Sequence, residues 1–521
     1  MPSHSTTENL RLAADLHRRG DFASARRLYG EVLARDPDNA EAAHLAGVAA
    51  ADQGRPTEAL GLLRRAARLD PRSPIVHLNL AATLGALGRA DAALAAIDAA
   101  AILEPRLPRV HRLRGDVLRS TGRFDAALKS FQRAAELVPD DAGIRILCGD
   151  MLAMQDRMEE ALHAYEEALA IDPGNCEAHK QRGVVLTVLQ RHAQALASLE
   201  RAVELAPQSA DARYTRAVVL LTIGDYARGF REHEWRWHSR LTSSSRERRT
   251  FTQPLWLGRE SLVGRRILLY SEQGLGDTLQ FCRYVSAVSE RGATILLQVQ
   301  RPLIELLRWL PGVAAIIAED EAPPPFDCHC PLMSLPLALD TRLENVPAPR
   351  AYLRADPDLV ATWHQRLGER RAPRVGLMWN GNPDNPSDRY RSFRLADWLK
   401  HLPAGFEYVS LQRFVRPEDR EALRRGVVRD LSKQQTRFDD AAALCECMDI
   451  VISVCTSIAH LSGALGRPTW ILLSQQADWR WLLVREDSPW YPTARLYWQS
   501  ERGVWSSVFA NIAVDLVREF R

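Results

Sequence analysis

The chain has 521 residues, with 68 Lys and Arg against 65 Asp and Glu and a formal net charge of +3. Apolar residues make up 46% and charged residues 26%, which excludes a disordered chain and a membrane-embedded one. Basic and acidic residues are interspersed without a basic face or tail, so the sequence argues against a nucleic-acid-binding protein. The length predicts about three or four domains.

The N-terminus lacks the basic and apolar segments of a secretory signal, and no apolar run approaches the roughly 20 residues of a spanning helix. We therefore expect a cytoplasmic protein without a transmembrane segment. In a reducing compartment its eight cysteines are expected to be free thiols. The pairs Cys328/Cys330 and Cys445/Cys447 are spaced more closely than the ligands of structural zinc sites, which favours core thiols.

A repeat of 34 residues occupies the first part of the chain. Prolines, alanines and a second set of small residues recur at this step: Pro37, Pro71, Pro105, Pro139, Pro173 and Pro207; Ala25, Ala59, Ala93, Ala127, Ala161 and Ala195; Gly47, Ala81, Gly115, Gly149, Gly183 and Ala217. Small side chains let two helices approach closely, and the proline ends the second helix. Over residues 6–240 the pattern resembles about seven tetratricopeptide repeats.

A turn is predicted between the two helices of each unit, at Gly20, Gly54, Gly88, Gly122 and Gly224, with Asp156 and Gln190 at the two exceptions. The seventh unit is degenerate, and its aromatic residues, including Tyr226 and Phe230, are predicted to cap the array by packing onto the C-terminal half of the chain. The resemblance implies a concave groove that holds a protein or peptide. The alternative is an array that spaces the rest of the chain or forms a homo-oligomer.

After a Ser- and Arg-rich linker at 241–250, short apolar runs alternate with helical stretches, which indicates an α/β fold with parallel sheets. Two series of strands are predicted: 266–270, 294–299 and 313–318, then 374–379, 407–411, 449–454 and 469–473. They predict two Rossmann-like lobes, 251–372 and 373–521, that face each other across a cleft. Ligands are expected at the carboxyl ends of the strands.

Two motifs follow predicted strands: Gly274-x-Gly276-Asp277 and Thr456-Ser457-x-x-His460. They resemble glycosyltransferase family 9, the heptosyltransferases. Together with the array they resemble bacterial repeat proteins that carry a family-9-like transferase domain. The resemblance implies a GT-B arrangement of the two lobes and inverting transfer of a sugar from a nucleotide-sugar donor. It implies no cofactor and no required metal.

Inverting transfer needs a carboxylate that takes the proton of the acceptor hydroxyl, and Asp277 fits this role. The alternative is an aspartate that only caps a helix. Thr456 and Ser457 are predicted at a helix N-terminus that meets the diphosphate, or as caps of that helix. His460, one turn later, donates to a phosphate or sugar oxygen or is a packed core histidine.

The remaining donor-site candidates lie in loops. Arg391 is the expected cation for the leaving group, although a solvated arginine would give the same pattern. Asn380 and Gln412 stand at strand ends and are predicted to contact the sugar or base. Gly274 and Gly276 are predicted to allow a tight turn that brings the backbone close to the ligand.

Two departures from the family pattern matter. Cys455 replaces an acidic residue before the Thr/Ser pair, and the loop 384–388 lacks a lysine expected near the phosphates. Two hypotheses therefore stand. The first is a glycosyltransferase whose repeats recruit a protein or envelope-glycan acceptor, and the second is a repeat scaffold with an inactive transferase-like domain. A dinucleotide-dependent oxidoreductase is excluded because the glycine motif lacks its third glycine.

Overall fold

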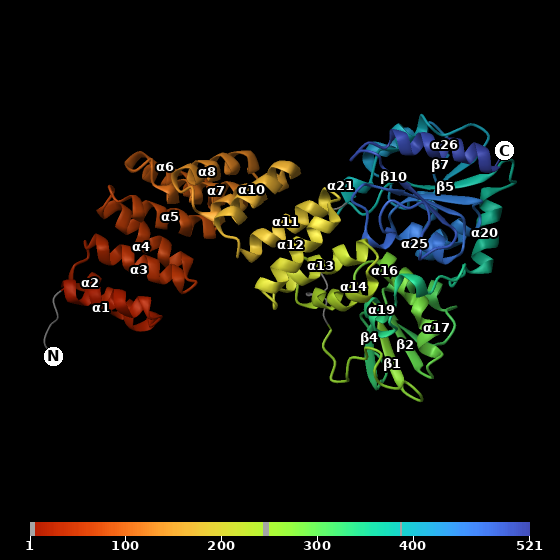
Figure 1. Ribbon diagram of the computed structural model, residues 1–521, viewed down its shortest axis with the longest axis horizontal. Helices are drawn as coiled ribbons and strands as arrows, with labels where there is room; N and C mark the ends of the chain where they lie inside the picture. Colours follow the sequence, from red (N-terminus) through yellow and green to blue (C-terminus); the bar gives the residue numbers. More distant parts are fainter. Residues whose placement is uncertain (1–5, 243–248, 386–387, 521) are drawn as a thin grey trace. The chain divides into compact units, whose positions relative to one another are not determined.

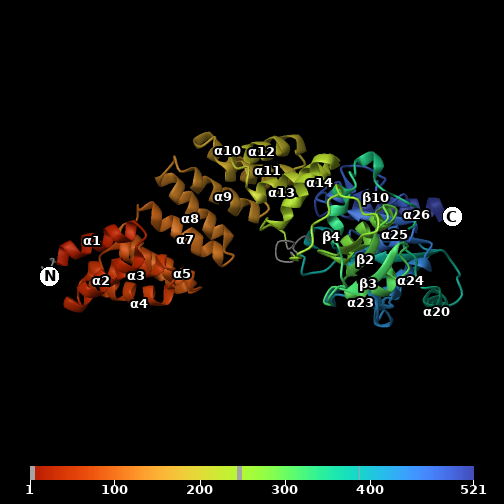
Figure 2. The ribbon, with the colours of Figure 1, turned by 90° about the horizontal axis from the view of Figure 1, so that it is seen from below.

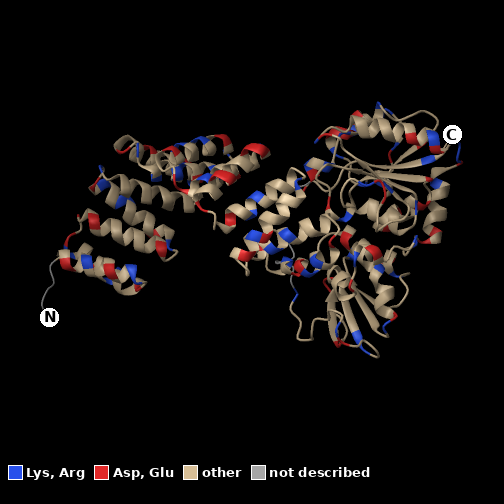
Figure 3. Cartoon of the chain, in the orientation of Figure 1, with Lys and Arg blue, Asp and Glu red and all other residues tan. Residues whose placement is uncertain are grey.

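The computed structural model describes residues 6–242, 249–385 and 388–520. The chain divides into two compact units, Met1–Pro207 and Gln208–Arg521 (Figure 1). In the described residues, no helix has both the length and the apolar character needed to cross a lipid bilayer. Lys and Arg are intermixed with Asp and Glu along the helices of both units (Figure 3), as the order of the residues in the sequence predicts.

The first unit consists of helix pairs (Figures 1 and 2). In the described residues these are α1 (Thr6–Arg18) with α2 (Phe22–Arg35), α3 (Ala40–Asp52) with α4 (Pro56–Leu69), α5 (Pro74–Ala86) with α6 (Ala90–Leu103), α7 (Pro108–Ser120) with α8 (Phe124–Leu137), α9 (Ala142–Met154) with α10 (Met158–Ile171), and α11 (Cys176–Val188) with α12 (His192–Leu205). Successive pairs pack on their sequence neighbours.

The repeat positions have the roles predicted for them. Every predicted turn residue, including Asp156 and Gln190, has a positive φ, between 60° and 87°. The repeated alanines are fully buried. A Cβ atom at Gly115 would lie 2.5 Å from the Phe131 ring, and one at Gly149 would lie 2.6 Å from Tyr165. The small residues therefore let the paired helices touch.

The second unit begins with helices that the sequence groups with the array. These are α13 (Ala210–Thr222), α14 (Tyr226–His233) and the short helix η1 (Glu234–Trp237). Tyr226 and Phe230 are buried in the same apolar core as the first strand, which confirms that this aromatic segment packs onto the C-terminal half of the chain. Most of the predicted linker, 243–248, lies outside the described residues.

The first sheet is parallel, with the strand order β3-β2-β1-β4. Its strands are β1 (Arg266–Tyr270), β2 (Thr294–Val299), β3 (Val313–Ala318) and β4 (Cys328–Pro331). The first three confirm the predicted ranges. The sequence missed β4 because this short strand ends in proline and alternates two buried thiols with a histidine instead of showing an apolar run. Short helices connect these strands: α16 (Leu275–Phe281), η2 (Cys282–Tyr284), α17 (Val285–Ser289), η3 (Arg301–Leu303), α18 (Ile304–Leu307), η4 (Leu332–Ser334), α19 (Leu335–Ala338) and η5 (Leu343–Asn345).

The second sheet is also parallel, with the order β10-β9-β8-β5-β6-β7. Its strands are β5 (Arg374–Met378), β6 (Glu407–Ser410), β7 (Val428–Arg429), β8 (Ile450–Val454), β9 (Thr469–Leu473) and β10 (Ala494–Trp498). Four were predicted to within one residue at each end, and β7 and β10 were missed. The associated helices are α20 (Pro357–Leu367), α21 (Asp388–Arg391), α22 (Leu395–Leu399), η6 (Pro417–Asp419), α23 (Arg420–Arg424), η7 (Ser432–Gln434), α24 (Phe438–Glu446), α25 (Ser457–Ala464), η8 (Trp479–Trp481) and α26 (Ser506–Phe520).

Both faces of the second sheet are buried. One face packs with α22 and α26 in a core of its own. The other packs with α24 and α25 in a core that continues through the first sheet to Tyr226 and Phe230. The two sheets thereby share one continuous apolar core.

Candidate functional site

A cleft of about 960 Å³ lies in the second unit, where the β1–α16 turn meets the carboxyl ends of β5, β6 and β8. All nine site residues predicted from the sequence line it: Gly274, Gly276, Asp277, Asn380, Arg391, Gln412, Thr456, Ser457 and His460. The structure thus brings together residues that are up to 186 positions apart in the chain. The wall also contains residues to which the sequence assigned no role.

The β1–α16 turn carries the first motif. Gly274 has φ −86°, and Gln273, not a glycine, takes the left-handed conformation at φ 61°. The prediction that the glycines supply the backbone freedom of this turn is therefore wrong. Gly276 serves a different purpose, because a Cβ atom there would lie 3.0 Å from Cδ2 of His460. Its missing side chain lets α16 pack against the start of α25.

Asp277 is held from two sides. Its Oδ2 accepts a hydrogen bond of 2.9 Å from the Gly274 amide, so it does cap the helix. Its Oδ1 accepts from the Arg480 guanidinium in an ion pair. Burial raises the pKa of Asp277, and the charge of Arg480 opposes that rise. The result is a partly exposed carboxylate that is a stronger base than an aspartate in water.

Arg480 is the main site residue to which the sequence assigned no role. Besides Asp277, it donates to Asp478 at 2.7 Å and to Gln280 at 2.6 Å, and its side chain is 6% exposed. Its guanidinium also lies 4.5 Å from the centre of the Trp479 ring. Arg480 lies 203 residues from its carboxylate partner, so no local pattern could have predicted the pair.

The second motif forms the start of α25. Thr456 is the N-cap, and its hydroxyl accepts from the Ile458 amide at 3.3 Å, so the capping role is observed. Ser457 is the first helical residue. Because both residues line the cleft, the positive end of the helix dipole faces the same space.

His460 is buried, as its core alternative predicted, yet it lines the cleft. Its Nδ1 is 2.8 Å from the Tyr491 hydroxyl, and its ring stacks on Trp481 at 5.3 Å. Burial, with a further contribution from the charge of Arg480, lowers the pKa of His460 to about 3. The imidazole is therefore neutral at physiological pH and can act as a hydrogen-bond partner but not as a cation.

Arginines give the cleft its charge. Arg391, the predicted cation, donates to the Cys455 carbonyl at 2.7 Å and to Asp388 at 3.4 Å, so its guanidinium is fixed in the wall. Arg416 pairs with the same aspartate. In the described residues, the lining holds five arginines against two aspartates: Arg391, Arg413, Arg416, Arg437 and Arg480 against Asp277 and Asp478. This excess favours an anionic ligand. Residues 386–387, in the loop without the expected lysine, lie outside the described residues.

Asn380 and Gln412 hold the ends of β5 and β6 together. The Asn380 amide group donates to Asp419 at 2.6 Å, and Gln412 bonds the Asn380 backbone at both its N–H (3.2 Å) and its carbonyl (3.3 Å). Both side chains are buried. They shape the wall, and their amides already have protein partners.

Cys455 stands between the two halves of the site. Trp481 donates to its sulfur at 3.1 Å. Burial raises the pKa of the thiol, so a neutral group occupies the place where the family pattern has an acid. The cysteines of the two closely spaced pairs, Cys328/Cys330 and Cys445/Cys447, are buried free thiols. In the part of the chain that the structure describes, no cluster of three His, Cys, Asp or Glu is arranged to hold a metal ion.

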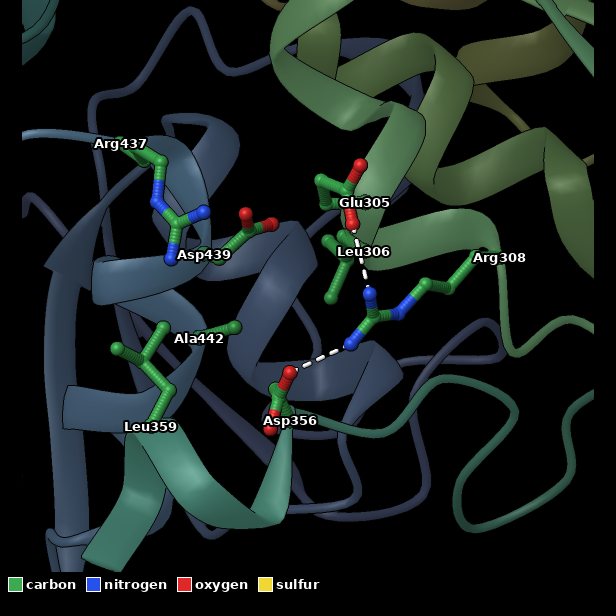
Figure 4. A pocket seen from close by; sticks show the side chains of 8 residues that line it. All are labelled: Glu305, Leu306, Arg308, Asp356, Leu359, Arg437, Asp439 and Ala442. Carbon is green, nitrogen blue, oxygen red and sulfur yellow. Dashed lines mark hydrogen bonds and ion pairs between the residues drawn. The ribbon is translucent and has the colours of Figure 1, made fainter. Parts of the chain in front are cut away.

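A second, much smaller cavity of about 50 Å³ lies where α18, α20 and α24 meet (Figure 4). Arg308 bridges Glu305 and Asp356 on one side of it, at 2.8 and 2.5 Å. Arg437 and Asp439 lie across from that bridge, and Arg437 also lines the large cleft. This volume suits water and is too small for a substrate.

Comparison with known proteins bears on the helical array. Residues 10–74, 112–175 and 182–233 match one tetratricopeptide repeat family, and residues 50–117 match another. The array is made of tetratricopeptide repeats. Such repeats form a scaffold suited to protein–protein interaction. In this chain they are followed by the two parallel sheets of the second unit.

Individual relatives are distant. Protein FlbA of Caulobacter vibrioides is 29% identical in an alignment of 331 residues that covers 57% of this chain and 53% of FlbA. The chain thus spans about half the length of that relative. Among solved structures, MamA is 24% identical over 32% of this chain and 92% of its own (TM-score 0.30). PilF of Pseudomonas aeruginosa is 20% identical over 41% and 96% (TM-score 0.36), and YrrB is 20% identical over 36% and 97% (TM-score 0.31).

Proposed function

We propose that the second unit is an inverting glycosyltransferase that takes a sugar from a nucleotide-sugar donor, and that the repeats recruit its acceptor, a protein or an envelope glycan. The observation that carries the proposal is the pairing of Asp277 with an anion-binding wall in one cleft. A base and a site for the departing diphosphate are the two parts that this reaction needs.

The diphosphate would lie at the start of α25. The positive end of the α25 dipole favours negative charge there. Arg391 and Arg480 border the same space and already have fixed guanidinium groups, so little reorganisation is needed when charge develops on the leaving group. Neutral His460 would offer a hydrogen bond to a phosphate or sugar oxygen.

Asp277 would take the proton from the acceptor hydroxyl. Its raised pKa makes this carboxylate the better base, and its partial exposure leaves it open to the cleft. No residue of this mechanism needs a metal, since positive charge comes from arginine side chains and a helix N-terminus.

The second candidate is a repeat scaffold whose cleft binds a nucleotide without turning it over. The neutral Cys455 thiol favours it, because a thiol is a poor acceptor for a sugar hydroxyl. The two candidates differ in turnover and agree in binding.

One screen separates them. The full chain is incubated with UDP-, GDP- and ADP-sugars, and both thermal unfolding and release of the nucleoside diphosphate are measured, for the wild type and for Cys455→Asp. Stabilisation by one donor class is expected because the ligand binds only the native state. Release of diphosphate that falls by about 10²–10⁴-fold in Asp277→Asn, and not in the surface control Asp320→Asn, supports the transferase. Binding without release supports the scaffold, and no stabilisation at millimolar concentration removes the transferase and leaves a scaffold without a nucleotide site.

A further inference from the structure

The seventh helical pair, α13 and α14, and the short helix η1 that follows it belong to the same compact unit as the cleft. Residues of α14 and η1 support the two members of the Asp277–Arg480 ion pair through separate contacts. One contact holds the turn that carries Asp277, and the other holds the short helix η8 that carries Arg480.

The first contact is a buried ion pair. Arg236, in η1, is 0% exposed and donates two hydrogen bonds to the Glu272 carboxylate, of 2.9 Å from Nε and 2.7 Å from Nη2. It also donates to Glu234 at 2.7 Å and Ser334 at 2.8 Å. Glu272 lies in the β1–α16 turn, five residues before Asp277, which is the third residue of α16. A two-pronged, fully buried pair fixes both position and orientation of the group that it holds.

The second contact is aromatic. Trp479 packs on Phe230 at 5.7 Å and on Tyr226 at 6.2 Å between ring centroids. The Tyr226 hydroxyl in turn accepts from Trp490 at 3.0 Å, which closes the cluster. Because η8 is a single turn, a displacement of Trp479 also displaces Arg480 and Trp481.

We propose that the seventh repeat, together with η1, positions two parts of the cleft. Arg236 holds the β1–α16 turn in place and Phe230 holds η8 in place, so that the Asp277 carboxylate and the Arg480 guanidinium form their ion pair. The last repeat would then form part of the support of the cleft within the second unit. The consequence for donor binding rests on the proposed function, whereas the geometry can be tested without any ligand.

The thiols of the chain provide the test. Cys455 is partly exposed and bonded by Trp481, so its reaction with a maleimide reports on η8. Cys282 directly follows α16 and reports on the Asp277 side. Cys445 and Cys447 are buried in and beside α24 and report on general unfolding of the unit. Peptide mass spectrometry of the labelled full chain gives each rate in one sample.

Phe230→Leu should raise the Cys455 rate by about tenfold, because local opening becomes easier, and leave Cys445 and Cys447 unchanged. Arg236→Lys keeps the charge but loses the fork, and it should raise the Cys282 rate similarly. The matched control is Phe509→Leu, the same change in α26 on the other face of the second sheet. Phe230→Leu keeps the test informative if Arg236→Lys does not fold.

The proposal is overturned if Cys455 reacts no faster in Phe230→Leu than in Phe509→Leu, or if all four thiols accelerate together. Nucleotide-sugar stabilisation, measured on the same variants, provides the separate arm. If the wild type binds no donor but the labelling pattern is as expected, the proposed function fails and the positioning role stands.

Discussion

The two units of this protein are specified in different ways. In the array, each predicted contact joins helices that are neighbours in the chain, and one 34-residue pattern is repeated. In the second unit, the central ion pair joins residues 203 positions apart, and a repeat helix lies in the same core as the sheets. The seventh repeat therefore continues the sequence pattern of the array, whereas its helices belong to the core of the second unit.

The largest effect is expected when the chain is shortened at either of two candidate boundaries, before Gln208 or before Phe251. A chain that begins at Gln208 should fold, and one that begins at Phe251 should not. The shorter chain lacks Arg236 and so buries Glu272 without its cation, which alone costs about 3–5 kcal/mol. Urea unfolding followed by circular dichroism checks this. Cooperative unfolding of the shorter chain would contradict the assignment of α13 and α14 to the second unit.

The next effect concerns how the stability of the second unit depends on pH, because this unit contains His460. The native pKa is depressed to about 3 from 6.5, so the unfolded chain takes up this proton first as the pH falls. The contribution of His460 to stability is complete above pH 6.5 and declines between pH 6.5 and 3, by about 1.4 kcal/mol per pH unit. Unfolding of His460→Gln in urea at several pH values should therefore show a shallower acid limb. Parallel limbs for the two proteins would mean that the buried imidazole titrates normally.

Two glycines of one motif offer a finer comparison. Gly276→Ala places a methyl group 3.0 Å from His460 and should destabilise the approach of α16 to α25 by about 1–3 kcal/mol. Gly274→Ala meets only Asp277 Oδ2, at 3.4 Å, and should be close to neutral. Thermal unfolding and donor binding measured on both variants check the difference. Equal effects would show that the close approach at Gly276 does not matter.

The array should respond to glycine substitution with either sign, depending on the position. Gly30 and Gly61 are exposed residues of α2 and α4, and apart from the adjacent residues and the helix's own backbone no described atom is within 4 Å of a Cβ built at either. Gly30→Ala and Gly61→Ala should each stabilise the first unit by about 0.5–1 kcal/mol, because alanine loses less backbone entropy in a helix. Gly115→Ala, against Phe131, is the destabilising control in the same scan of urea midpoints.

Much of the fold could be predicted because its signals are local. The proline and glycine spacing fixes the repeats, and apolar runs bounded by turns gave seven strands. The strands β4, β7 and β10 were missed because β4 and β7 are very short and β10 mixes charged and aromatic residues. Their pairing partners, not their own sequences, make them strands.

The site was predictable to the extent that motifs carry it. Asp277, Thr456 and His460 belong to short patterns at strand ends, so they could be found one at a time. The roles of Arg480 and Arg236 could not be predicted, because each acts through a residue that only the fold brings near. Asn380 and Gln412 were predicted from their places at strand ends to contact the ligand, but their side chains bond protein groups and form part of the cleft wall.

The proposed function requires that a nucleotide-sugar binds in the cleft of the second unit, between Asp277 and the start of α25. Peptide-resolved hydrogen exchange of the full chain, with and without the donor that stabilises it, tests this most directly. We expect protection of residues 273–281 and 455–461 and no change in peptides of α1–α12. Protection confined to the array, or none in either segment of the cleft, would contradict the account.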